Sequence, residues 1–281
     1  MDLTKNLKYG KFDLQVGPVQ VSYTVPKAWF GELDATFGAW KVQTSSTESV
    51  IHRASVHIVA APSIEASSLK VEVEELCAAT SRWRWNTDPR HFSETDWVDY
   101  RGVKADRRRH IDSALRNILA NYVQFHGDAF MHASSVVVDG KAWVAPGQSG
   151  RGKTTFFHAL GGYAAGHLHE DLCFITNGKV FSLPCRSSNT SWEMPTPTSV
   201  ELAGFIELGR SKGVEGKEIV GLTDKLRVVG TASVAPLKRW DAADALRSLK
   251  NLEHLASQYR CLRLSFPREV STKLLLAQLA N

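Results

Sequence analysis

The chain has 281 residues, of which 43% are hydrophobic and 22% charged, as expected for one large or two modest folded domains. The 34 Lys and Arg exceed the 29 Asp and Glu by 5, a surplus that suits an anionic ligand but is too small and scattered to indicate nucleic acid. Four cysteines without a CxxC pair argue against a zinc site or a disulfide framework. No apolar run has the length of a membrane span and no signal-peptide core follows the start, so we expect a cytoplasmic protein with no membrane partner.

The first part of the chain, residues 1–105, is expected to form a small α+β region. Alternating apolar residues over 19–25 predict a half-buried strand, and residues 28–42 have the apolar spacing of a helix. Residues 56–60 indicate a further short strand. Residues 80–99 are rich in Arg, Trp and Asp and show little periodicity, so no regular element is expected there.

The second part, residues 106–281, is expected to be an α/β catalytic domain. Residues 111–122 repeat apolar side chains at intervals of three and four, which predicts an amphipathic helix. Two apolar segments, 130–138 and 141–145, flank Asp139-Gly140, a strong signal for a β-hairpin.

The later elements alternate between strand and helix. We expect strands over 172–176, 179–183, 202–208 and 261–265, and helices over 153–160, 242–255 and 274–279. Residues 187–199 are rich in Ser, Thr and Pro, which is typical of an irregular loop.

The second strand of the hairpin leads directly into a glycine-rich segment. It reads Gly147-Gln148-Ser149-Gly150-Arg151-Gly152-Lys153-Thr154, followed by Thr155. Phosphates need several converging donors, and the three glycines would let backbone N–H groups curl around them. Lys153 can reach the β- and γ-phosphates, the Thr154 hydroxyl can ligate magnesium, and the helix dipole favours the anion. Residues 147–155 are therefore expected to bind ATP or GTP together with Mg²⁺.

Catalysis also needs a carboxylate that faces the phosphates. Glu170 and Asp171 precede an apolar strand, where adjacent side chains point in opposite directions, so only one can face the γ-phosphate unless the backbone turns. We assign the metal or proton role to Asp171, with Glu170 assisting at the metal. His167 and His169 lie just before these acids, and a transition-metal site is an alternative. His132, at the start of the hairpin, is either structural or part of the site.

The order of these motifs resembles that of a known family. His132-Ala133-Ser134, the Asp139-Gly140 hairpin, the loop 147–154 and His169-Glu170-Asp171-Leu172 look like the HPr kinase/phosphorylase catalytic domain. They are more closely similar to the HPr-kinase-like proteins found beside peptide-modifying genes, including lasso-peptide kinases. The segment 259–268 also resembles the end of those proteins, and the resemblance covers residues 107 to 270.

The resemblance implies a P-loop fold related to phosphoenolpyruvate carboxykinase and ATP- and magnesium-dependent phosphoryl transfer to a hydroxyl. It places His132 near the transferred phosphate, Lys153 as the loop lysine and Thr154 as the metal-binding hydroxyl. Asp171 would be the proton acceptor or metal neighbour, and Glu170 stands where the family usually has Asp. Members of the family assemble, which implies a homo-oligomer. The signature for HPr binding and phosphorylase activity is not evident, so HPr is not the expected acceptor.

The favoured function is therefore a kinase for Ser or Thr of a peptide or protein, as in the tailoring of peptide natural products. The acceptor would approach from the side of residues 187–199, and residues 1–105 would dock the substrate. A small-molecule kinase for an amino acid or sugar is the first alternative. A regulatory nucleotide-binding ATPase and an enzyme that attacks a different phosphate are the others.

Overall fold

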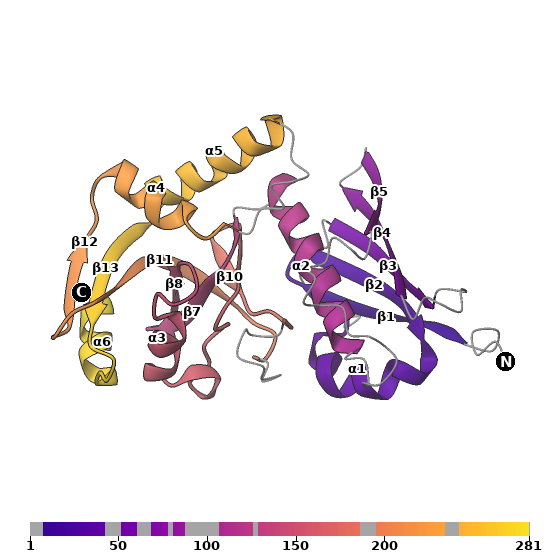
Figure 1. Ribbon diagram of the computed structural model, residues 1–281, viewed down its shortest axis with the longest axis horizontal. Helices are drawn as coiled ribbons and strands as arrows, with labels where there is room; N and C mark the ends of the chain where they lie inside the picture. The colour runs from indigo at the N-terminus through magenta and orange to yellow at the C-terminus, as the bar shows by residue number, and fades with distance from the viewer. Residues whose placement is uncertain are drawn as a thin grey trace. The chain divides into compact units, whose positions relative to one another are not determined.

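The chain divides into two compact units, Met1–Ile118 and Leu119–Asn281, shown in a computed structural model (Figure 1). The structure describes residues 8–42, 52–60, 69–77, 81–87, 107–125, 129–185, 195–233 and 242–280. Helix α2 (Arg107–Phe125) contributes residues to both units. None of the helices in these described ranges is both long enough and apolar enough to cross a membrane.

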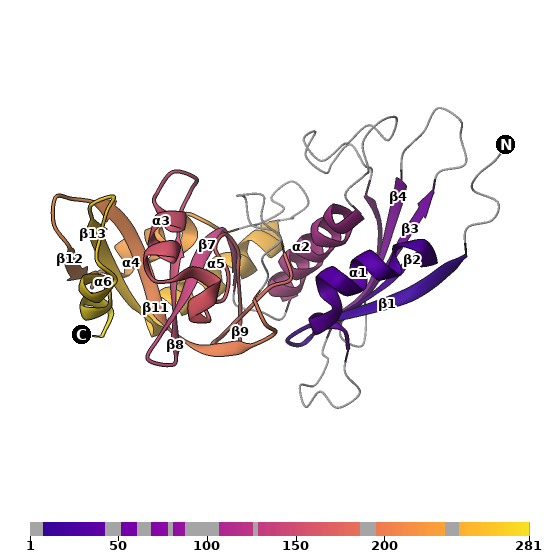
Figure 2. The same ribbon diagram turned by 90° about the horizontal axis from the view of Figure 1, so that it is seen from below.

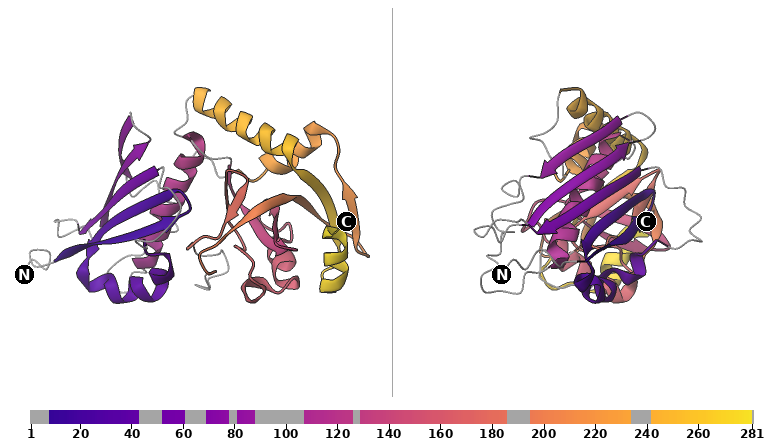
Figure 3. Two further views of the ribbon diagram at one scale, coloured as in Figure 1. Left: turned by 180° about the vertical axis from the view of Figure 1, so that it is seen from behind. Right: turned by 90° about the vertical axis from the view of Figure 1, so that its right-hand side faces the viewer.

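The first unit is built on a five-stranded sheet. Its strands, in spatial order, are β1 (Tyr9–Val16), β2 (Val19–Pro26), β3 (His52–Ala60), β4 (Leu69–Cys77) and β5 (Ser81–Thr87). Neighbouring strands are antiparallel except β2 and β3, which are parallel, and Figure 3 shows them side by side. The expected strand over 19–25 is confirmed.

The expectation of no regular element over 80–99 is wrong for β5, while residues 88–99 lie outside the described ranges. In β5, Trp83 and Trp85 alternate with Arg82 and Arg84, and aromatic residues at every second position favour a strand.

Two helices cover the same face of this sheet. Helix α1 (Phe30–Phe37) is flanked by the 3₁₀ turns η1 (Lys27–Trp29) and η2 (Gly38–Trp40), so the expected helix over 28–42 is present in three pieces. Phe12 of β1 and Tyr23 of β2 lie directly opposite each other and so share a face. Phe12 packs against Phe37 of α1 at 6.4 Å, and the Tyr23 hydroxyl donates to the carbonyl of Ile111 in α2 at 3.1 Å (Figure 2).

The second unit contains a mixed eight-stranded sheet. Its strands are β6 (Ala129–Met131), β7 (Ala133–Val138), β8 (Lys141–Pro146), β9 (Cys173–Thr176), β10 (Lys179–Phe181), β11 (Ser199–Arg210), β12 (Glu215–Glu218) and β13 (Arg260–Phe266). The 12-residue strand β11 joins its parts, because it is antiparallel to β10 and parallel to both β8 and β13. Strand β8 also forms the expected hairpin with β7.

Helices cover both faces of this sheet. They are α3 (Lys153–Ala159), the 3₁₀ turn η5 (Gly162–Ala165), α4 (Leu222–Gly230), α5 (Ala242–Gln258) and α6 (Thr272–Leu279). One hydrophobic core contains residues of α3 and α6, and the other contains residues of α4 and α5, in agreement with their places in Figure 1. Neighbouring residues of β7 alternate between the two: Val136 and Val138 belong to the first core, and Val137 packs against the second.

One expected strand, 130–138, is broken in two at His132. The residues before the break pair with β9, and those after it pair with β8. The apolar run hides this change of partner, because each half is a buried strand. Strands β1, β4 and β12 and helix α4 are additional elements.

Gly204 provides a test of the packing around β11. It pairs with Trp143 of β8 on one side and with Arg260 of β13 on the other. A Cβ atom at Gly204 would lie 2.5 Å from the Arg260 carbonyl oxygen and 2.8 Å from the Trp143 ring. We expect Gly204→Ala to lower the free energy of unfolding by about 1–3 kcal/mol, measured by urea denaturation. The control Gly213→Ala, with no atom within 4 Å of its new Cβ, should change it by less than about 0.5 kcal/mol. Equal midpoints for the two variants would contradict this packing.

Candidate functional site

The glycine-rich segment forms a turn between β8 and α3. Gly147, its first residue, is held in place because its N–H donates to the carbonyl of His132 at 3.2 Å. Gly150 and Gly152 have φ values of +84° and +93°, which L side chains rarely adopt. Helix α3 then begins at Lys153, and its first turn is closed by the N–H of Phe156 to the carbonyl of Gly152 at 2.9 Å. The expected strand–loop–helix arrangement is therefore present.

The expectation that all three glycines supply conformational freedom is wrong for Gly147. Gly147 is not among the residues with positive φ, and a Cβ there would make only an ordinary contact, 3.4 Å from Cβ of Arg151. Gly150 and Gly152 are therefore the positions at which the conformation itself requires glycine. Around them Gln148, Ser149, Arg151 and Thr155 are exposed.

Lys153 lies folded back on its own loop. Its side chain is buried, and Nζ donates to the carbonyl oxygens of Gly147 at 2.7 Å and Gln148 at 3.1 Å. Burial lowers the pKa of the Lys153 ammonium, and the negative charge of Asp171 partly opposes this effect. The loop lysine and the predicted base therefore interact electrostatically.

The acidic turn is held against β7 by backbone hydrogen bonds. The N–H of Ser135 donates to the carbonyl of His169 at 2.8 Å, and the N–H of Ala133 donates to the carbonyl of Asp171 at 3.1 Å. Because Ala133 follows His132, this register also brings the two predicted catalytic side chains together. Nε2 of His132 lies 3.3 Å from Oδ1 of Asp171.

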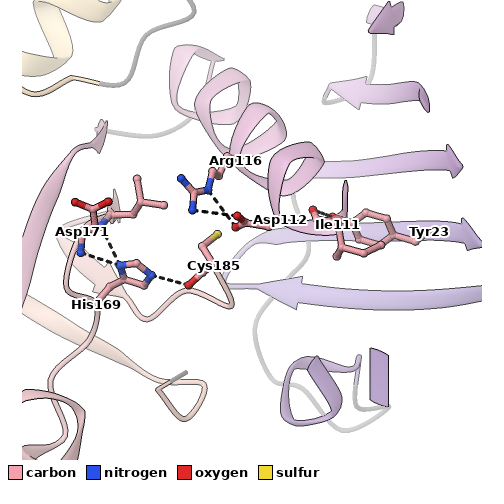
Figure 4. Close-up of polar contacts among 8 residues, drawn as sticks. Tyr23, Ile111, Asp112, Arg116, His169, Asp171 and Cys185 are labelled. Carbon is pink, nitrogen blue, oxygen red and sulfur yellow. Dashed lines mark hydrogen bonds and ion pairs between the residues drawn. The ribbon is translucent and has the colours of Figure 1, made fainter. Parts of the chain in front are cut away.

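The imidazole of His169 shapes this turn (Figure 4). Its Nδ1 accepts the N–H groups of Asp171 at 3.1 Å and Leu172 at 2.9 Å. Its Nε2 lies 2.8 Å from the carbonyl oxygen of Cys185, which can only accept, so the ring is neutral with its proton on Nε2. The ring thus acts as a cap for the backbone that carries Asp171.

His167, two residues before His169, has a corresponding role. Its Nδ1 accepts the N–H of Val137 at 3.1 Å, and its Nε2 donates to the carbonyl of Leu160 at 3.0 Å. The nitrogens of His167 and His169 are thus used in structural hydrogen bonds, so the alternative of a transition-metal site is wrong. In the part of the chain that the structure describes, no group of three or more His, Cys, Asp or Glu could hold a metal ion.

Glu170 and Asp171 are both buried but contact different partners. They lie in a bend before β9, so the backbone does turn at the acids. Asp171 pairs with His132, whereas Oε2 of Glu170 lies 3.8 Å from Nε2 of His158 in α3. The two carboxylates and the hydroxyl of Thr154 are oxygen donors, the kind of ligand that Mg²⁺ prefers, and proteins bind this ion through one or two carboxylates together with substrate phosphates.

His158 and Tyr163 both contact Glu170, and neither was predicted from the sequence. His158 follows Thr154 by four residues and therefore lies on the same helix face. That spacing was the available signal. Tyr163 has no comparable signal, because its contact with the N–H of Glu170 at 3.4 Å depends on how η5 folds back. Residues 187–194 of the expected acceptor loop, 187–199, lie outside the described ranges.

The two kinds of loop glycine can be distinguished by substitution. Gly152→Ala places a Cβ in a left-handed conformation and is expected to lower the free energy of unfolding by about 1–2 kcal/mol. Gly147→Ala has no such strain and should cost less than about 0.5 kcal/mol. Urea denaturation without nucleotide measures both, and an equal loss in the two variants would contradict the described loop conformation.

His167 should make stability depend on pH. Burial lowers its pKa below the ordinary value of 6.5, with the hydrogen bond to Leu160 opposing. The unfolded chain then binds the proton more readily, so this stability is present above pH 6.5 and is lost as pH falls through the folded pKa. The fall in unfolding free energy from pH 7 to pH 5 should be smaller in His167→Gln, by about 1.4 kcal/mol for each tenfold difference in proton affinity. His254→Gln, at an exposed site in α5, is the control, and an unchanged pH slope in His167→Gln would refute the assignment.

Comparisons with known proteins add no assignment: no family model matches the chain, and no curated protein matches it. Function therefore has to be inferred from the geometry of the site.

Proposed function

We propose that this protein transfers the γ-phosphoryl group of ATP to a hydroxyl, with Ser or Thr of a peptide or protein as the preferred acceptor. One observation carries the proposal. The lysine of a phosphate-binding loop interacts electrostatically with Asp171, and the same carboxylate pairs with His132. A phosphate anchor and a carboxylate base are parts that phosphoryl transfer uses, and an imidazole beside the base can hold its carboxylate in place.

The residues act mainly by positioning and electrostatics. Lys153 leaves the carbonyl oxygens of Gly147 and Gln148 when a polyphosphate offers stronger, charged acceptors, and it then stabilises the β- and γ-phosphates. Asp171 accepts the proton of the acceptor hydroxyl as its oxygen attacks the γ-phosphorus. The new O–P bond forms while the bond to the β-phosphate oxygen breaks, and ADP leaves. His132 holds Oδ1 of Asp171 and leaves Oδ2 for the proton.

Thr154 and Glu170 are the residues that would hold Mg²⁺, whose charge offsets the negative charge on the phosphates, while Asp171 supplies the base. Thr154 is half-buried at the start of α3, and Glu170 and Asp171 are buried, which limits competition from water at the two carboxylates.

The strand order supports a fold of the phosphoenolpyruvate-carboxykinase type. The strand that leads into the loop, β8, is antiparallel to β7 and parallel to β11. Because the strand before the loop has an antiparallel hairpin partner, the sheet is mixed, and this favours a phosphoenolpyruvate-carboxykinase-type fold over a P-loop fold with an all-parallel sheet. It agrees with the family resemblance of the motifs, which also favours a peptide acceptor.

The proposal is tested by incubating the protein with ATP, Mg²⁺ and a panel containing Ser/Thr peptides, free serine and sugars, followed by mass spectrometry. We expect one phosphoryl group on an acceptor and ADP as the nucleotide product. Lys153→Ala should abolish transfer, and Asp171→Asn should slow it by about 10²–10⁴-fold while nucleotide binding persists. Lys141→Ala, at the exposed first residue of β8, and Asp139→Asn, in the exposed hairpin turn, are the charge-matched controls. Asn tolerates the φ of 49° at position 139.

Each outcome separates the alternatives. A phosphorylated metabolite without a phosphorylated peptide would identify a small-molecule kinase. ADP formation with no modified acceptor would indicate a regulatory ATPase, and AMP or pyrophosphate would indicate attack at a different phosphate. Near-normal turnover in Asp171→Asn would show that Asp171 is not the base.

A further inference from the structure

The contacts of Glu170 indicate a positioning residue in α3. The carboxylate of Glu170 is 2% exposed, and its Oε2 lies 3.8 Å from Nε2 of His158. At this distance the two groups face each other and interact electrostatically without a hydrogen bond. The two partners differ in exposure, because the side chain of His158 is 56% exposed whereas that of Glu170 is buried. A buried acid is thus approached from the solvent side by an imidazole.

The position of His158 follows from the helix that begins with the loop lysine. Thr154 and His158 are four residues apart in α3, so they lie one above the other on the same face. Glu170 contacts the second of these residues. A carboxylate that reaches this face can meet a cation held by the first.

The segment after the loop holds Glu170 at a second point. The hydroxyl of Tyr163 accepts the N–H of Glu170 at 3.4 Å. The Tyr163 ring packs edge-on against Phe157 at 4.9 Å, which anchors it to α3. The backbone and the side chain of Glu170 are therefore both contacted from the loop side.

The ring of His158 is itself confined. Phe157 packs edge-on against it at 5.5 Å. On another side, a Cβ atom at Gly162 would lie 3.2 Å from Nδ1 of His158, so glycine leaves the space that the ring occupies. An exposed side chain with packed neighbours loses less freedom when it pairs with an acid.

We propose that His158 is a positioning residue that orients the carboxylate of Glu170 toward a divalent cation shared with Thr154. The proposal rests on the proposed function, in which Glu170 and Thr154 hold Mg²⁺ with the nucleotide. Residues that orient a ligating carboxylate typically change metal affinity by about 10–100-fold when they are removed. His158 therefore acts on the metal through Glu170 and touches no reacting atom.

The test measures Mn²⁺ binding by electron paramagnetic resonance in the presence of ADP. We expect His158→Ala to weaken Mn²⁺ binding at least about tenfold, while ADP affinity without metal and the melting temperature stay unchanged. His158→Gln keeps a polar N–H group on a side chain of similar reach, so its dipole still faces the carboxylate, and it should restore part of the affinity. His254→Ala, at an exposed histidine in α5, should behave as wild type.

A double-mutant cycle completes the test. Once Glu170 is shortened in Glu170→Asp, we expect that adding His158→Ala weakens Mn²⁺ binding by less than twofold, because the contact is already lost. Unchanged Mn²⁺ affinity in His158→Ala, or equal effects in both backgrounds, would overturn the positioning role. Loss of metal-free ADP binding in His158→Ala would assign the residue to the loop's structure instead. Failure of the wild type to bind ADP would overturn the proposed function itself.

Discussion

The register between β7 and the acidic turn is the constraint on which the site depends. Backbone hydrogen bonds from Ala133 to Asp171 and between Ser135 and His169 hold the turn beside the strand that precedes the loop. The carbonyl of His132, one residue earlier, accepts the N–H of Gly147. One continuous backbone network therefore places the loop, the imidazole and the carboxylate. If the acidic turn paired with β7 one residue out of this register, the side chain of Asp171 would face away from His132.

Burial gives these charges their effect. Lys153, Glu170 and Asp171 are all buried, and electrostatic interactions between buried groups are screened less than at the surface. The carbonyl oxygens of Gly147 and Gln148 accept hydrogen bonds from Lys153, and burial lowers the pKa of its ammonium while the charge of Asp171 opposes this effect. The neutral imidazole of His169 holds the acidic turn without adding a charge to the site.

Several elements of the second unit could be predicted from local patterns in the sequence, whereas the local alternation of β5 was missed. The hairpin around Asp139-Gly140, the loop and helix α2 were all predicted, because turn chemistry and apolar spacing are properties of neighbouring residues. The strand over 130–138 was predicted whole, yet the chain changes partner at His132. Burial on both faces makes such strands continuous apolar runs, which do not reveal where pairing changes. The contacts of Glu170 with His158 and Tyr163 depend on segments that fold back on one another.

The sequence by itself determined that a strand, a glycine-rich turn and a helix follow one another, and that Lys153 and Thr154 begin that helix. These features need only short-range geometry. Only the tertiary structure decided that Asp171 meets His132, that Glu170 meets His158, and that His167 and His169 are structural. Each of these contacts joins residues from different elements, and strand register and helix packing, which involve the whole unit, bring them together.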